Sequence, residues 1–166
     1  EFTEGASTTR DLIAINTAKQ IRILDSTSHF YAHLALSPDE QKLAWISWEH
    51  PQMPWDGTQL RLADIDPQGN LVNTTILAGN ESEAVNSPVW SNSGKLYFVS
   101  DASGFWNVWE SDTKGSKRQL VSESAEWAHP MWIVGTHLLR ILDSGELVGI
   151  HGNPAQEKIA LIDPNT

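Results

Sequence analysis

The feature that most constrains this sequence is a unit that recurs three times: a short apolar run, a polar turn and a second apolar run. The three copies span residues 33–47, 87–100 and 129–142. The residues just before the turns, Leu36, Trp90 and Trp132, stand 54 and 42 positions apart. Four-stranded propeller blades repeat every 40–50 residues or so. The longer first spacing is explained by an insertion at 49–57.

Two further strands are expected after the first two units, and one after the third. The predicted strands are 59–65 and 73–78 in the first blade, 105–110 and 117–121 in the second, and 159–163 in the third. Turns at 66–69 and 112–115 contain Pro, Gly, Asp or Thr, which suit turn conformations. The N-terminal runs 11–16 and 20–24 resemble the outer two strands of a preceding blade.

The pattern within the strands favours stacked blades. The inner runs 43–46 and 96–99 are continuously apolar, as expected of strands buried on both faces. The outer strand alternates, with Leu60 and Leu62 set against Gln59 and Arg61. A single blade cannot bury both faces, so neighbouring blades must cover each other. A β-sandwich is the alternative all-β architecture, and the repeated unit favours the propeller over it.

The predicted fold class is therefore all-β, a partial β-propeller of four-stranded antiparallel blades in one domain over 1–166. Its expected parts are the outer strands of one blade at 10–25, blades at 30–80 and 86–122, and an incomplete blade at 128–166. A closed propeller has about 4–8 blades. The missing blades are expected either elsewhere in a longer protein or from self-association that closes the ring.

Charge and composition exclude several partners. The formal net charge is −10, and the Lys and Arg residues, 11 in all, are scattered. Such a surface repels nucleic acid and anionic membranes, so neither partner is expected. The chain has no Cys, which excludes disulfides and thiolate chemistry. No cofactor or metal is predicted. No signal peptide is visible; the compartment stays open, with the cytoplasm favoured.

Two stretches resemble a known family. The run 37–58, which contains His50-Pro51 and Met53-Pro-Trp-Asp-Gly-Thr58, is similar to the propeller of prolyl oligopeptidase-type serine peptidases, and 88–109 gives a second match. The insertion favours the acylaminoacyl-peptidase and dipeptidyl-aminopeptidase branch. TolB-like propellers share only the generic turns. Glu40 departs from the family, which usually has Gly there.

The resemblance implies a function for the whole protein. Family members carry a catalytic α/β-hydrolase domain with a Gly-x-Ser-x-Gly elbow, and this chain contains no such motif. No residue is therefore assigned to a catalytic triad, and this chain alone is not expected to be an enzyme. Its implied role is to gate and select peptide substrates for the absent domain of a serine peptidase. The alternative is a stand-alone TolB-like propeller that binds other proteins.

The insertion at 49–57 is the best candidate site. Its two prolines stiffen the loop. The candidate substrate-binding residues are Glu49, His50, Trp55 and Asp56. Their carboxylates could pair with the free amine of a peptide. The competing interpretation is a structural insertion with Trp55 packed on its own blade.

Other polar residues are interpreted as structural. His29 and His33 are four apart on an extended run and should share a face, but with Asp25 they make no diagnostic metal pattern. Asp101 and Asn107 are expected to cap a tight turn with their own side chains. The remaining histidines, His129, His137 and His151, show no pairing in the sequence.

Overall fold

The structure is a computed structural model that describes residues 10–153 and 155–166. Within those residues it contains strands and no helix, and therefore no helix able to span a membrane. Its strands are β1 (Leu12–Ile15), β2 (Ile21–Asp25), β3 (Phe30–Leu36), β4 (Lys42–Trp48), β5 (Gln59–Ile65), β6 (Leu71–Ala78), β7 (Val85–Trp90), β8 (Leu96–Ser100), β9 (Asn107–Ser111), β10 (Lys117–Gln119), β11 (Leu139–Ile141), β12 (Leu147–His151) and β13 (Lys158–Ile162).

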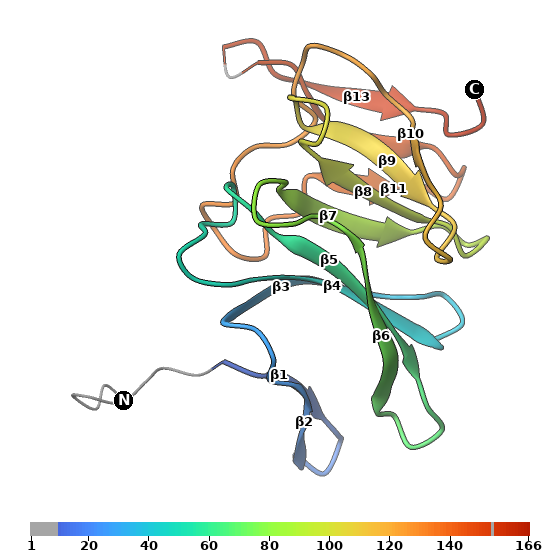
Figure 1. Ribbon diagram of the computed structural model, residues 1–166. Coiled ribbons are helices and arrows are strands. Elements are labelled where there is room, and N and C mark those ends of the chain that lie inside the picture. Colours follow the sequence, from blue (N-terminus) through green and yellow to red (C-terminus); the bar gives the residue numbers. More distant parts are fainter. Residues whose placement is uncertain (1–9, 154) are drawn as a thin grey trace.

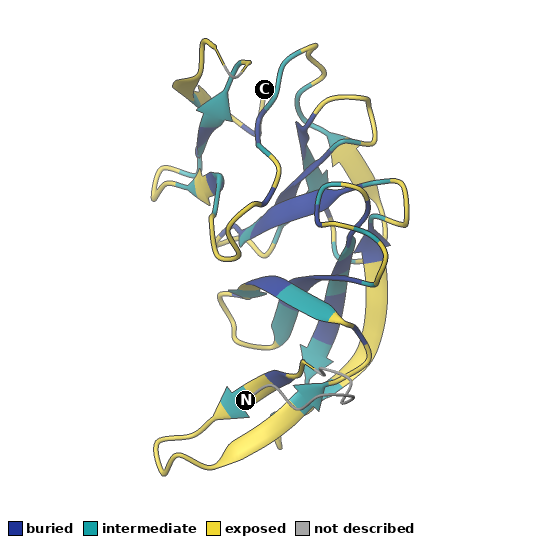
Figure 2. Ribbon diagram, turned by 90° about the vertical axis from the view of Figure 1, so that its left-hand side faces the viewer, coloured by how far each residue is buried: buried dark blue, intermediate teal, exposed yellow. Residues whose placement is uncertain are grey.

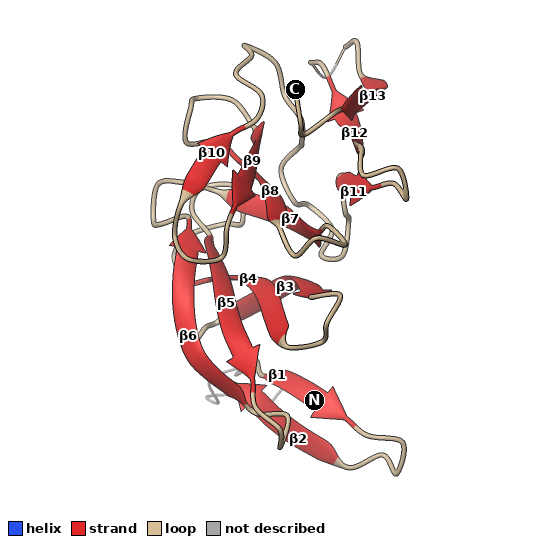
Figure 3. Ribbon diagram, turned by 90° about the vertical axis from the view of Figure 1, so that its right-hand side faces the viewer, coloured by secondary structure: helices blue, strands red, loops and turns tan. Residues whose placement is uncertain are grey.

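The strands form four antiparallel sheets in chain order (Figure 1). They are the hairpin β1-β2, the sheets β3-β4-β5-β6 and β7-β8-β9-β10, and the three-stranded sheet β11-β12-β13. The sheets follow one another along a curved path rather than facing each other as two layers (Figure 3). The fold is thus a partial all-β propeller, as the sequence predicted.

Most strands lie where the apolar runs placed them. β5 coincides with the predicted 59–65, and β6 begins two residues earlier than expected. The hairpin β1-β2 falls on the two N-terminal runs, whereas residues 1–9 of the expected domain lie outside the described residues. The inner runs are buried as predicted except for Leu43, which is half-buried: all of β8 and the last five residues of β4 are buried.

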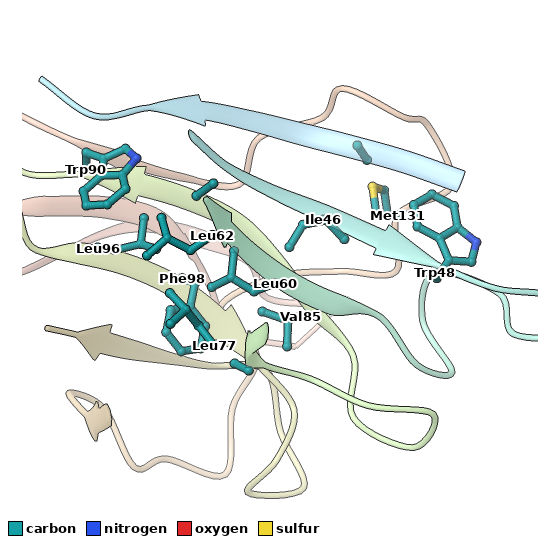
Figure 4. Close-up of a cluster of buried hydrophobic side chains, with 13 residues drawn as sticks. Ile46, Trp48, Leu60, Leu62, Leu77, Val85, Trp90, Leu96, Phe98 and Met131 are labelled. Carbon is teal, nitrogen blue, oxygen red and sulfur yellow. The ribbon is translucent and has the colours of Figure 1, made fainter. Parts of the chain in front are cut away.

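Each junction between neighbouring sheets contains its own apolar cluster. Leu62, Leu77 and Phe98 lie between the second and third sheets (Figure 4). Val108 and Leu147 belong to a second cluster between the third and fourth sheets. The first and last sheets keep open faces: the isoleucines of the β1-β2 hairpin are exposed (Figure 2), as are Ile159 and Leu161 of β13. Apolar burial stabilises the junctions by roughly 25 cal/mol per Å².

The inner strands are joined by hydrogen bonds at matching β-bulges. β3 is bulged between Ala32 and Ala35, and β7 between Asn86 and Val89. Both bulges hold a residue with positive φ, His33 at 52° and Ser87 at 50°. Such residues are uncommon outside glycine and need surrounding contacts to hold them.

Those contacts form a chain across three sheets. The Ser87 backbone N–H donates to His33 Nδ1 at 3.0 Å, and the Leu138 backbone N–H donates to Ser87 Oγ at 3.1 Å. Trp90 Nε1 adds a bond to the Ala35 carbonyl oxygen at 3.0 Å. The side chain of each bulge residue, His33 or Ser87, therefore accepts a backbone N–H from the next unit. These hydrogen bonds fix the relative positions of the inner strands.

The register expected for the third repeat is wrong. Residues 129–138 form no strand, and Trp132 is 75% exposed instead of ending an inner strand. The strand–turn–strand unit is β11, a turn at 142–145 closed by the Gly145 N–H to the Leu142 carbonyl, and β12. The run Pro130-Met-Trp132 imitates Pro88-Val-Trp90 but belongs to a long loop. The landmark before the third turn is thus Ile141.

Antiparallel pairing gives the blades two different ends. The tight turns β3–β4, β5–β6, β7–β8, β9–β10 and β11–β12 lie at one end, which we call the turn end. The connections β4–β5, β6–β7, β8–β9, β10–β11 and β12–β13 lie at the other, the loop end. The candidate insertion at 49–57 is at the loop end.

Candidate functional site

Glu49 and His50 lie where β4 leaves the sheet, next to the segment that leads into β3. The Glu49 carboxylate Oε2 is 2.5 Å from His29 Nδ1 and accepts the His29 backbone N–H at 3.0 Å. The His50 ring stands edge-on to Phe30 with centroids 4.8 Å apart. The Arg10 guanidinium lies over the same Phe30 ring, 4.5 Å from its centroid. Glu49 and His50 are therefore held in place by the start of β3 and by the residue that precedes it, His29.

Trp55 and Asp56 lie in the second half of the same loop and have different surroundings. Asp56 Oδ2 accepts the Met53 backbone N–H at 3.0 Å, which makes it a turn cap. The Trp55 ring is 4.2 Å from that of Trp132, which comes from the long loop before β11. The expectation that Trp55 packs on its own blade does not hold, since it contacts the next units of the chain.

The structure brings only part of the predicted set together. Glu49 and His50 border a shallow hollow of about 180 Å³ that also touches Asn80 and Glu81. Trp55 and Asp56 do not line it. The insertion therefore offers one polar corner and, on its other side, an aromatic corner formed by Trp55 with Trp132.

Acidic residues dominate the loop end. The described loops there contain no Lys or Arg, whereas they carry the carboxylates of Glu49, Asp56, Glu81, Glu83, Asp101, Glu123, Glu126 and Glu157. The nearest cations are Arg10, which packs on Phe30 beside the insertion, and Arg61, Arg140 and Lys158, which lie in the first residues of β5, β11 and β13. The carboxylates of this end outnumber them. This end therefore presents a negative field to a molecule that approaches it.

Several of these carboxylates also hold the fold. Asp101 Oδ1 accepts the Ala84 N–H at 2.8 Å, and Glu126 Oε2 accepts the Trp106 N–H at 2.7 Å. Burial raises the pKa of Asp101, and the nearby charges of Glu83 and Glu126 raise it further. The Asn107 side chain donates to the Phe105 carbonyl oxygen at 3.3 Å. Asn107 binds its own turn, as expected, whereas the Asp101 carboxylate binds the distant Ala84 segment instead of capping its own turn.

The histidines are paired, contrary to the sequence-based expectation. His129 lies 3.5 Å from Glu157, and His151 lies 2.6 Å from Glu123. His137 packs on His33 with ring centroids 4.8 Å apart. All these partners come from distant segments, so sequence spacing held no signal of them.

His29 and His33 do not share a face, because the bulge in β3 breaks the alternation of side chains. His33 is 5% exposed, and the side chain of His29 is 54% exposed. Burial lowers the pKa of His33 to about 4, with a further contribution from His137. Neutral His33 is the form that can accept the Ser87 N–H at Nδ1.

Comparison with known proteins identifies the class. No protein-family profile and no curated protein matches the chain. Among solved structures, a puromycin-hydrolysing peptidase of Mycobacterium tuberculosis matches with a TM-score of 0.82 and 33% identity over 90% of this chain and 22% of that one. A puromycin hydrolase matches with a TM-score of 0.84 and 31% identity, over 90% and 23%.

A more distant match shows the fold alone. The putative TolB of Agrobacterium tumefaciens has a TM-score of 0.63 at 16% identity, over 86% of this chain and 48% of that one. This chain spans about a fifth of the length of the two peptidases. It is a propeller segment of the kind found in peptidases of the prolyl oligopeptidase family, and the resemblance stated from residues 37–58 and 88–109 is confirmed.

Proposed function

We propose that this segment gates and selects peptide substrates for a catalytic α/β-hydrolase domain outside the chain. The loop end would face that domain, so the insertion at 49–57 would border the substrate cavity. The observation that carries the proposal is the set of carboxylates at this end, whose loops contain no Lys or Arg within the described residues. A negative cavity wall attracts the ammonium group of a peptide.

Glu49 is the residue we propose for contact with that amine. Its carboxylate is 43% exposed and is oriented by His29, so it is both reachable and fixed. Asp56 would contribute to the field without binding directly, because its Oδ2 caps Met53. His50 and Trp55 would shape the polar and aromatic corners of the insertion. On this basis we favour an aminopeptidase-like preference over N-blocked peptides within the acylaminoacyl-peptidase and dipeptidyl-aminopeptidase branch.

The test is kinetic and uses the protein that joins this segment to its catalytic domain. Glu49→Gln should lower kcat/KM for a phenylalanyl arylamide by about 5–10-fold, which is roughly the 1 kcal/mol of an ion pair with a half-exposed carboxylate. It should leave the N-acetylated arylamide unchanged. Asp66→Asn, at the turn end, is the matched control and should alter neither substrate. Equal losses on both substrates would refute amine recognition by Glu49.

A binding module without an attached peptidase is the second candidate. It is favoured by the open apolar faces at both ends of the described chain, Ile15 and Ile21 at one and Ile159 and Leu161 at the other. Such faces associate. If the 166-residue chain occurs by itself, we expect it to self-associate and close the ring. Light scattering over a range of concentrations checks this, and a well-folded monomer throughout would contradict it.

A further inference from the structure

A second hollow at the loop end carries features of a binding site that the insertion lacks. It has a volume of about 430 Å³ and lies where the loop 129–138 crosses the inner strands. Its walls include His33, Asn86, Met131, Trp132, Ile133 and Leu138. Pockets of this size, mostly apolar with a few polar groups, are the usual form of ligand sites.

Asn86 is the unusual residue of this wall. It is 1% exposed, yet among the described residues neither Oδ1 nor Nδ2 of its side chain has a hydrogen-bond partner. An unpaired buried amide costs about 1–3 kcal/mol per group. His33, also in the wall, is buried, and its ring interacts with the Thr136 backbone, which partly offsets the lowering of its pKa. The Asn86 amide is therefore the unsatisfied polar group from which the inference follows.

Asn107 shows that an equally buried asparagine in this fold is normally satisfied. It is also 1% exposed. Its Nδ2 donates to Ser103 Oγ and to the carbonyl oxygens of Phe105 and Glu123, and its Oδ1 accepts the Glu123 N–H. The contrast indicates that Asn86 is adapted to a partner other than the protein's own groups.

Another wall consists of exposed apolar side chains. Trp132 and Ile133, which line the hollow, are 75% and 72% exposed, and Val134, which follows them in the chain outside the hollow, is 62% exposed. The neighbouring Met131 is buried in the cluster beside Trp48 (Figure 4), which anchors the loop. The Trp132 ring also contacts Trp55. Consecutive exposed apolar residues on an anchored loop are costly to keep unless something packs on them.

We infer that this hollow is a subsite for an uncharged peptide amide carrying an apolar side chain. The Asn86 amide, one donor and one acceptor, matches a peptide C=O and N–H. The side chain of the peptide residue would lie against Met131, Trp132 and Leu138. A charged group is disfavoured, because no Lys, Arg, Asp or Glu lines the hollow, His33 is buried and neutral, and the other lining histidine, His129, is paired with Glu157. The inference rests on the proposed function for its peptide class.

The first experiment titrates the 166-residue chain with N-acetyl-phenylalaninamide and follows backbone and indole N–H signals by NMR. We expect a Kd of about 1 mM, the range for so small a ligand, with shifts at Trp132, Asn86 and Leu138. N-acetyl-glycinamide, which lacks the side chain, should bind at least tenfold more weakly. No binding of the phenylalanine compound, or shifts confined to other residues, would overturn the inference.

The second experiment uses variants. Asn86→Leu should weaken binding about tenfold while leaving the chain as stable as before or more so, because no bond within the protein is lost. Asn107→Leu, the matched control, should be strongly destabilised. Trp132→Ala should also weaken binding about tenfold without affecting stability. If Asn86→Leu destabilised the chain as much as Asn107→Leu, the Asn86 amide would be satisfied by buried water and the subsite refuted.

These outcomes are separate from those of the proposed function. Binding at the hollow with no effect of Glu49→Gln on arylamide kinetics would refute amine selection and keep the subsite. No binding at the hollow, together with the expected kinetic effect of Glu49→Gln, would refute the subsite alone.

Discussion

The two ends of the blades are built in different ways. At the turn end, short turns are held by their own side chains: Asp66 Oδ1 accepts the Gln68 and Asn70 N–H groups, and Asp112 Oδ1 accepts those of Lys114 and Ser116. At the loop end, the contacts join distant segments, as with the Thr58 hydroxyl and Val85. The turn end is mainly locally determined, although Arg22 also donates to the carbonyl oxygens of Gln68 and Gly69 in the 66–69 turn. The loop end depends more on contacts between distant segments, although Asp56 caps Met53 locally. The contacts between distant segments and the candidate sites therefore lie at the same end, the loop end.

The largest expected effect comes from two glycines that share a backbone conformation but lie at opposite ends. Gly79, at the loop end, has φ +85°, and an added Cβ would lie 1.9 Å from the Thr58 carbonyl oxygen. Gly94, at the turn end, has φ +81° and open space around it. Gly79→Ala should cost about 4 kcal/mol or prevent folding, and Gly94→Ala about 1 kcal/mol. Urea unfolding measures both, and equal losses would contradict the distinction between the ends.

The next largest effect is expected from removing a buried hydroxyl at the loop end. Thr58 is 1% exposed, and its Oγ1 donates to the Val85 carbonyl oxygen at 2.7 Å and accepts the Val85 N–H at 2.6 Å. Thr58→Val keeps the shape of the side chain but leaves the Val85 carbonyl oxygen and N–H without their hydrogen-bond partner. We expect this to lower the free energy of unfolding by about 2–3 kcal/mol. Thr75→Val, on the exposed strand β6, should change the free energy of unfolding by less than about 0.5 kcal/mol. A similar small value for Thr58→Val would show that the bridge is dispensable.

The hydrogen bond from the Ser87 N–H to His33, which joins β7 to β3, predicts that the free energy of unfolding depends on pH. The pKa of His33 falls to about 4 in the folded chain from an ordinary 6.5, so the unfolded chain binds more protons between these values. Stability contributed by neutral His33 is therefore complete above about pH 6.5 and declines as the pH falls toward 4, by up to about 3 kcal/mol.

His33→Asn is the matched variant, because Asn tolerates positive φ and its Oδ1 can accept the Ser87 N–H. The slope of unfolding free energy against pH between about 6.5 and 4 should be smaller in the variant than in the wild-type chain. Identical slopes would mean that carboxylates alone set the acid response. His137, whose pKa is also lowered by burial, remains in both proteins.

The smallest effect is expected for an ion pair near the turn end. Lys42 Nζ bonds to Asp64 Oδ1 across β4 and β5, and both side chains are more than a third exposed. This contact lowers the pKa of Asp64, but water and salt screen it. Lys42→Met should change stability by no more than about 0.5 kcal/mol, and by less still at high salt. A loss above that of Gly94→Ala would show that the turn end depends on charge.

The sequence predicted the turn end and the strands well because their determinants are local. The turns at 66–69 and 112–115, the strand 59–65 and the buried run 96–99 all follow from residue types and short-range patterns. Glu40 is an instructive departure: its φ of 58° explains why a glycine suits that turn, and the turn forms with Glu nonetheless.

The loop end was predicted less well because its determinants are distant in sequence. The His33–His137 contact, the unpaired amide of Asn86 and the meeting of Trp55 with Trp132 each join residues that no spacing rule connects. The false match of Pro130-Met-Trp132 to Pro88-Val-Trp90 arose in the same way. A local pattern placed a strand where tertiary contacts build an anchored loop.

The most direct test of the account asks which end of the propeller faces the catalytic domain. A photo-crosslinking residue replaces Met53, which is 47% exposed at the loop end, or Asn92, which is exposed at the turn end, in the protein that contains both domains. Mass spectrometry then locates the crosslinks. The account predicts crosslinks from position 53 into the catalytic domain and few from position 92. The reverse pattern would contradict the assignment of the loop end as the substrate-selecting surface.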